Sequence, residues 1–358
     1  MIEILREIPQ YWLFRTIGHP IKMPLNVTLS VTYACNARCK TCNIWKRKAK
    51  DLSLEELEMV FRSLGKAPYW FTISGGEPFL RKDIADICRS IYTNCKPGII
   101  NIPTNGLLCD VIPDKVRDIV ESCPQTNIVI NLSLDGVGSD HDDIRGVPGN
   151  WEKAMKTYYA LRKLDYPNFE LGIHSVLSTY NVDSLPRIYE YVMTELKPDS
   201  YITEIAEERV ELGTIGANIT PSLEEYARAI DFLSEKIKQH EFSGLSKITE
   251  AFRIQYYSLV KEVLQRKRQI IPCYAGFASA QIAPDGDVWM CCITAEPIGN
   301  LRHVGYDFGK VWFSSKANEL RRRIKSNECY CPMANASYTN MLHHFPALAK
   351  VGWRVLTS

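Results

Sequence analysis

Short apolar runs of strand type alternate with segments of helical period from residue 26 onward. The runs are NVTLSVTY (26–33), YWFTIS (69–74), GIINIPT (98–104), NIVINLSLD (127–135), FELGIHSVLS (169–178) and SYITEIA (200–206). Between them apolar residues recur every three to four positions, and a capping box of Ser53 and Glu56 opens the first such segment. Repeated strand–helix units predict an α/β fold in which helices cover a parallel sheet with right-handed crossovers.

The pattern changes after residue 240. A long helix is expected over about 245–268, and in the following stretch (271–292) two strand-type runs flank PDGD, which predicts a hairpin. The sequence therefore divides into an amphipathic segment (1–25), a partial barrel of six β/α units (26–240), and a linker helix with a small hairpin-and-helix domain (241–358).

Polar or glycine-rich loops follow the first four predicted strands. They are CNARCKTC (35–42), SGGEP (74–78), TNG (104–106) and LDG (134–136). Parallel β/α folds bind ligands at the carboxyl ends of their strands, so these loops are expected to share one face and to form the functional site.

The cysteines are expected to bind metal or to carry redox chemistry. The chain has 12 of them, and its amino terminus (MIEILREIPQ) does not read as a secretory signal. A reducing compartment disfavours disulfides. Three thiolates at Cys35, Cys39 and Cys42 could hold zinc if a distant fourth ligand joined them, or an iron–sulfur cubane with one iron left open.

Cys-x3-Cys-x2-Cys after the first strand and Ser-Gly-Gly-Glu-Pro after the second together resemble the radical S-adenosylmethionine (SAM) superfamily. The resemblance implies that Cys35, Cys39 and Cys42 hold a 4Fe-4S cluster whose fourth iron chelates SAM. One-electron reduction then yields a 5′-deoxyadenosyl radical that abstracts hydrogen from a substrate.

The same resemblance implies a set of SAM-binding residues. Backbone at the two glycines approaches the methionine moiety, the glutamate accepts from its ammonium, and the serine and arginine meet ribose or carboxylate. These residues are Gly75, Gly76, Glu77, Pro78, Ser133 and Arg145.

The cysteines of the last quarter resemble the extension called SPASM, or its shortened form, twitch. The resemblance implies an auxiliary 4Fe-4S cluster held by Cys273, Cys291, Cys329 and Cys331. Cys292 is an alternative to Cys291. Zinc and scattered core thiols are alternatives to the cluster itself.

The substrate is expected to be a small molecule, sugar or lipid that is oxidised or rearranged after hydrogen abstraction. Modification of a peptide is the alternative, and an iron–sulfur electron-transfer or scaffold protein without SAM cleavage is the alternative of another class. Charged residues at the end of the sixth strand and one histidine in the fifth receive no catalytic role: Glu204, Glu207, Glu208, Arg209 and His174.

Charge and hydropathy bound the remaining partners. The chain has 43 Lys and Arg residues against 41 Asp and Glu residues, so its charge shows no basic excess of the kind that indicates nucleic-acid binding. The sequence contains no run of about 18 apolar residues, so no membrane span is expected and the enzyme is expected to be cytoplasmic. The resemblance to the radical SAM superfamily implies a reductant such as flavodoxin or ferredoxin. Aromatic and basic segments at both ends raise the option of peripheral membrane contact.

Overall fold

Six parallel strands form the larger part of one nine-stranded sheet in the computed structural model, which describes residues 2–239 and 244–357. Their bounds are β1 (Asn26–Thr32), β2 (Trp70–Gly75), β3 (Ile99–Thr104), β4 (Asn127–Ser133), β5 (Phe169–Leu177) and β6 (Ser200–Ile205). They lie side by side in chain order, so the predicted partial β/α barrel is confirmed.

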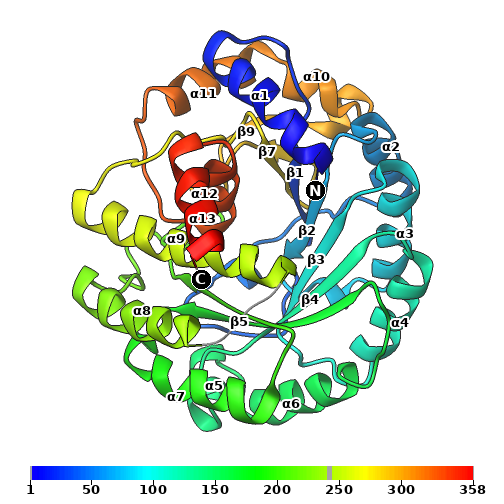
Figure 1. Ribbon diagram of the computed structural model, residues 1–358. Helices are drawn as coiled ribbons and strands as arrows, with labels where there is room; N and C mark the ends of the chain where they lie inside the picture. The colour runs from blue at the N-terminus through cyan, green and yellow to red at the C-terminus, as the bar shows by residue number, and fades with distance from the viewer. Residues whose placement is uncertain (1, 240–243, 358) are drawn as a thin grey trace.

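Helices surround this sheet on its outer face (Figure 1). They are α2 (Leu54–Leu64), α3 (Ile84–Cys95), α4 (Ile112–Ser122), α5 (Ser139–Arg145), α6 (Asn150–Leu161), α7 (Leu185–Tyr191) and α8 (Leu223–Lys238). The predicted capping box is present: the Ser53 side chain accepts from the Glu56 N–H, and the Glu56 carboxylate accepts from the Ser53 N–H. A π-helical turn (Val192–Leu196) extends α7.

The two faces of the strands differ in polarity. Alternate residues such as Ile128, Ile130 and Leu132 belong to the apolar core under the helices. Because successive side chains of a strand point to opposite faces, the intervening residues line the inside of the barrel. Polar side chains predominate there: Thr28, Ser30, Thr72, Ser74, Asn101, Asn131, Ser133, His174 and Glu204. We call this inner face the lumen.

The carboxyl-terminal part continues the same sheet. It contains α9 (Gly244–Arg266), β7 (Ser279–Ile282), β8 (Asp287–Trp289), β9 (Pro297–Asn300), the short 3-10 helix η5 (Leu301–Val304), α10 (Phe308–Trp312), α11 (Ser315–Lys325), α12 (Ala334–Leu342) and α13 (Phe345–Thr357). The predicted hairpin is confirmed, since β7 and β8 pair antiparallel. The sequence did not predict that β7 also pairs parallel with β1 and so joins the hairpin to the barrel.

Helix α1 (Ile2–Ile17) packs on the beginning of this carboxyl-terminal part. Tyr11 and Phe14 are buried in a cluster with Tyr274 and Phe277, and the Arg15 guanidinium donates to the carbonyl of Cys273 at 2.9 Å. Trp12, at 52% exposure, lies outside this contact. No helix within residues 2–239 and 244–357 combines the length and hydropathy needed to span a bilayer.

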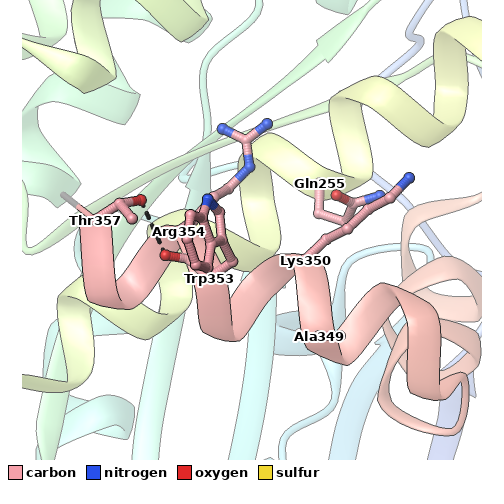
Figure 2. Close-up of a pocket in the computed structure, with 6 residues that line it drawn as sticks. All are labelled: Gln255, Ala349, Lys350, Trp353, Arg354 and Thr357. Atoms are coloured by element: carbon pink, nitrogen blue, oxygen red, sulfur yellow. Dashed lines mark hydrogen bonds between the residues drawn. The ribbon is translucent and has the colours of Figure 1, made fainter.

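Helix α12 fills the lumen at the amino-terminal end of β1. The Asn335 amide donates to the Thr28 hydroxyl at 2.9 Å and accepts from the Asn26 amide at 2.8 Å. Helices α9, α12 and α13 lie across the open centre of the barrel (Figure 1). A surface cavity of about 560 Å³ lies between α9 and α13 (Figure 2), and none of its lining residues is predicted from the sequence to be a site residue: Gln255, Ala349, Lys350, Trp353, Arg354 and Thr357.

Candidate functional site

The first cysteine loop connects β1 to α2 and is fixed by backbone hydrogen bonds to two distant segments. The N–H groups of Arg38 and Lys40 donate to the carbonyls of Arg145 and Ile144, both at 2.9 Å. Further on, the Asn43 N–H donates to the carbonyl of Leu212 at 2.9 Å. Helix α5, which follows β4, and the loop after β6 therefore hold the loop that follows β1.

Each thiol of this loop has its own N–H donor. The Ala37 N–H donates to Cys35 Sγ, the Ile44 N–H to Cys42 Sγ, and the Arg145 guanidinium to Cys39 Sγ, all at 3.4 Å. All three cysteines are half-buried and reduced. Donors of this kind stabilise cysteine thiolates bound to iron.

Burial is the main cause of a raised pKa at both Cys35 and Cys42, and the pKa of Cys42 rises to about 12. The neighbouring thiols raise both pKa values further, so Cys35 and Cys42 favour the neutral thiol unless a cation lies beside them. Within the described residues, no three His, Cys, Asp or Glu side chains converge as ligands of a single metal ion. A cubane cluster takes each thiolate on a different iron, and the donor set fits that requirement.

Gly75 and Gly76 allow the second loop to approach the first. A Cβ at Gly75, where φ is +117°, would lie 2.2 Å from the carbonyl oxygen of Thr32, and one at Gly76 would lie 2.0 Å from that of Ala34. The Gly76 N–H donates to Thr32 O at 2.7 Å. The structure thus gives these glycines a role in packing the cysteine loop, while their approach to a methionine moiety stays a prediction.

Glu77 is buried and joins three loop groups. Its carboxylate accepts from the N–H of Phe79 at 3.2 Å, the hydroxyl of Thr104 at 2.9 Å and the N–H of Asn105 at 2.8 Å. Burial raises the pKa of Glu77, and these donors oppose the rise. Pro78 begins the 3-10 turn (Pro78–Leu80) that Glu77 caps. The predicted bond from Glu77 to an ammonium group stays a prediction.

Asn105, which the sequence did not single out, links the third loop to the cysteines. Its side-chain amide donates to Asn36 Oδ1 at 2.8 Å and lies 4.0 Å from Cys35 Sγ. The sequence predicts the TNG loop at the carboxyl face of the sheet, but it does not indicate which residue a single asparagine in that loop contacts.

Arg145 lies beside the first cysteine loop. Its guanidinium donates to Cys39 Sγ and forms an ion pair with the buried Asp135 at 3.2 Å. Asp135 also accepts from the Val176 N–H at 2.8 Å, so it fixes β4 against β5. Ser133 ends β4 on the lumen side, half-buried and next to His174 in register. Contacts of Ser133 or Arg145 with SAM stay predictions.

The cysteines of the second group lie near one another. Burial is the main cause that raises the pKa of Cys331 well above its usual value, and the charges of Glu207, Cys273 and Cys292 contribute. Cys329 similarly contributes to the raised pKa of Cys273. Cys292 is buried, whereas Cys291 is half-buried. These thiols therefore influence one another electrostatically, while the ligation of an auxiliary cluster by Cys273, Cys291, Cys329 and Cys331, with Cys292 as the alternative to Cys291, stays a prediction.

The loop after β6 lies between the two cysteine groups. Glu207 and Glu211 in this loop are buried, and the guanidinium of Arg209 is the donor nearest to Cys292, at 3.6 Å. The sequence placed charges at this strand end but assigned them no role. Charged residues in a loop follow no periodic pattern, so the sequence alone does not indicate which of them are buried.

Two family models match the chain in the regions just described. Residues 29–192 match the radical SAM superfamily, and residues 273–333 match the SPASM iron–sulfur cluster-binding domain. Together they cover more than half of the chain, including all three cysteines of the first loop and the four predicted in the second group.

Several characterised proteins are similar to this chain. An AdoMet-dependent heme synthase from Methanosarcina barkeri is 24% identical over 322 residues, which is 85% of this chain and 86% of that protein. The mycofactocin maturase MftC from Mycolicibacterium smegmatis is 23% identical over 326 residues, 86% of this chain and 74% of that protein. The Fe-coproporphyrin III synthase from M. barkeri is 26% identical over 222 residues, 60% of this chain but only about half (52%) of the synthase.

Solved structures share the fold. Streptococcus suis SuiB bound to its precursor peptide SuiA superposes with a TM-score of 0.60 at 16% identity, over 89% of this chain and 72% of that chain. The protein anSMEcpe with bound AdoMet and a peptide gives a TM-score of 0.61 at 16% identity, over 93% and 98%. With both cysteine groups inside the matched domains, this chain belongs to the radical SAM superfamily and ends in a SPASM-type iron–sulfur domain.

Proposed function

We propose that this enzyme abstracts hydrogen from a peptide, with 4Fe-4S clusters and SAM as its cofactors. SAM bound at the first cluster supplies a 5′-deoxyadenosyl radical upon one-electron reduction. The chain's own residues hold the first cysteine loop on the carboxyl face of the barrel and leave a polar lumen beside it. An external reductant such as flavodoxin or ferredoxin is part of the proposal.

The composition of the lumen is the observation that carries the peptide proposal. None of the strands β1–β6 contains a lysine or an arginine. The side chains that line their inner face are mainly hydroxyls and amides, with Asn131 Nδ2 donating to Asn101 Oδ1 at 2.7 Å and His174 lying 3.5 Å from Glu204. Such groups suit the amides of a peptide, which both donate and accept hydrogen bonds.

The relatives support the same substrate class. They include a mycofactocin maturase, and the solved structures include two proteins with bound peptides. Sugars and lipids, the substrates first expected from the sequence, have no counterpart among these relatives.

A tetrapyrrole is the second candidate substrate, because the heme synthase matches over nearly the full length of both chains. A tetrapyrrole with ionised carboxylates would require cationic partners. The acidic and neutral lumen offers none on its strands, and this favours a peptide.

The proposed function is tested in two steps: SAM cleavage by the enzyme, and then deuterium transfer from candidate substrates. The enzyme is reconstituted anaerobically and reduced with dithionite, and 5′-deoxyadenosine is then measured. We expect the product in wild type and none in Cys35→Ala. An electron-transfer or scaffold protein would form no 5′-deoxyadenosine at all.

Peptides encoded beside the gene, deuterated at aliphatic positions, are compared with deuterated iron-coproporphyrin under the same conditions. We expect deuterium in 5′-deoxyadenosine from a peptide. Transfer from the porphyrin alone would replace the peptide proposal with the tetrapyrrole one.

A further inference from the structure

The loop of residues 207–214 physically connects the two cysteine groups. On one side, the Asn43 side-chain amide donates to the carbonyl of Gly213 and the Arg47 guanidinium donates to that of Glu211, both at 3.0 Å. On the other side, the Val210 N–H donates to the carbonyl of Ile293 at 3.0 Å. The loop is therefore hydrogen-bonded both to the first cysteine loop and to the residue that follows Cys292.

Arg209 is the cationic side chain at the centre of this connection. Its Nη1 lies 3.6 Å from Cys292 Sγ, 4.0 Å from Met333 Sδ and 3.8 Å from the Glu211 carboxylate. Cys292 directly follows Cys291, Met333 lies two positions after Cys331, and their sulfur atoms are 2.9 Å apart. The Arg209 side chain is only 23% exposed, so water screens its charge weakly.

Glu211 places an opposite charge in the same position. It is 8% exposed at its side chain, pairs with Arg209, and accepts from the Gln281 amide of β7. A cation and an anion thus lie side by side next to the auxiliary cysteines, on a loop that also contacts the first cysteine loop.

We propose that Arg209 is a positioning residue that raises the reduction potential of the auxiliary cluster and fixes it relative to the first cysteine loop. The inference rests on the proposed function for its cofactors. One electron from an external reductant takes a four-thiolate 4Fe-4S cluster from its oxidised to its reduced state and adds one negative charge to it. A nearby guanidinium stabilises that charge, and a nearby carboxylate opposes it.

The test is the reduction potential of each cluster in the reconstituted full-length enzyme, measured by dithionite titration with EPR detection and without peptide. In Arg209→Gln we expect at least a tenfold shift of the auxiliary couple toward the oxidised state, which is about 59 mV for one electron. Arg209→Lys keeps the charge and should recover most of the shift. Arg62→Gln, an exposed arginine on α2, should leave both potentials unchanged.

Glu211→Gln separates electrostatics from structural damage. It breaks the same ion pair, but we expect the auxiliary potential to move in the opposite direction, upward. A shift of the same sign in both variants, or no shift in Arg209→Gln with full iron content, would overturn the inference. If Arg209→Gln loses the cluster, the other two variants decide. An upward shift of the auxiliary potential in Glu211→Gln with a near wild-type potential in Arg209→Lys supports the inference, and a downward shift or no shift in Glu211→Gln overturns it.

This test is independent of the substrate. Expected potentials without any 5′-deoxyadenosine would leave the role of Arg209 in place and remove the proposed function. Conversely, 5′-deoxyadenosine formation with unchanged potentials would remove only the role of Arg209.

Discussion

Gly76 is the residue with the least space for a side chain next to the cysteines. Gly76→Ala would bring a Cβ to 2.0 Å from the carbonyl oxygen of Ala34, so the backbone before Cys35 must move. We expect iron after reconstitution to fall from about eight to about four atoms per chain, as for loss of one of two cubanes. Iron analysis with absorption spectra measures this.

Gly352→Ala is the matched control, because a Cβ at this position on α13 meets nothing within 4 Å. It should bind iron like wild type and gain a few tenths of a kcal/mol in helix stability, up to about 1 kcal/mol. Full iron content in Gly76→Ala would show that the loop tolerates the displacement.

At the scale of residues, the sequence singled out the cysteines of the first loop but not the residues around them. Cys35, Cys39 and Cys42 follow a spacing that is readable without a structure. Asp135 and Arg209 show no such readable spacing, because their partners lie on other loops. Arg209 and Cys292, for example, are 83 positions apart. A contact across the barrel leaves no local pattern in either segment.

At the scale of elements, the first turn of α2 also holds the carboxyl-terminal part. The Glu56 carboxylate caps the helix, accepts two hydrogen bonds from Arg302 at 2.8 and 3.0 Å, and accepts from the Tyr306 hydroxyl at 2.6 Å. The Arg302 guanidinium is the main cause that lowers the pKa of Glu56 to about 2.

Glu56→Gln should destabilise the protein by about 1–3 kcal/mol, because it replaces a partly buried carboxylate with a neutral amide whose NH2 group cannot accept from Arg302 or Tyr306. Glu58→Gln on the same helix is the control: its exposed pair with Arg62, at 3.4 Å, should contribute less than about 0.5 kcal/mol. Denaturant unfolding of the reconstituted proteins compares the two. Equal losses would contradict the bridging role of Glu56.

Helix α5 carries a histidine that should make stability depend on pH. His141 is fully buried and accepts from the Asp135 N–H at 3.2 Å; burial lowers its pKa from 6.5 to about 4. Between pH 6.5 and 4 this histidine is therefore protonated in the unfolded chain but neutral in the native state. Stability is therefore complete above pH 6.5 and falls as pH drops toward 4, by about 3 kcal/mol in total.

His141→Gln should flatten this dependence between pH 6.5 and 4.5, although it lowers stability at pH 7. Thermal unfolding across that range measures the slope for each protein. The exposed His303→Gln serves as control and should keep the wild-type slope. A wild-type slope in His141→Gln would refute the assignment.

The elements themselves were largely predictable. The six predicted barrel strands agree with β1–β6 to within two residues at each end, since alternating apolar patterns and flanking turn residues mark both ends. The pairing of β7 with β1 was not predictable, because register between strands distant in sequence depends on packing that no single strand encodes.

At the scale of the whole molecule, this pairing joins the barrel and the SPASM-type domain in one sheet, and we expect them to unfold together. A fragment of residues 1–239 would leave β1 with an unpaired edge and would remove α9 and α12 from the lumen. We expect it to be insoluble or to unfold without a cooperative transition, while the full chain unfolds in one step. Circular dichroism on heating compares them, and a soluble, cooperative fragment would contradict the shared sheet.

The hydrogen bonds of Asn335 with Asn26 and Thr28 have a consequence for substrate entry. They hold α12 against the amino-terminal end of β1, the end of the strand opposite the cysteine loops. Under the peptide proposal, we expect α12 to keep a chain from passing through the barrel, so that hydrogen is taken from a residue near a terminus or a tight turn of the peptide.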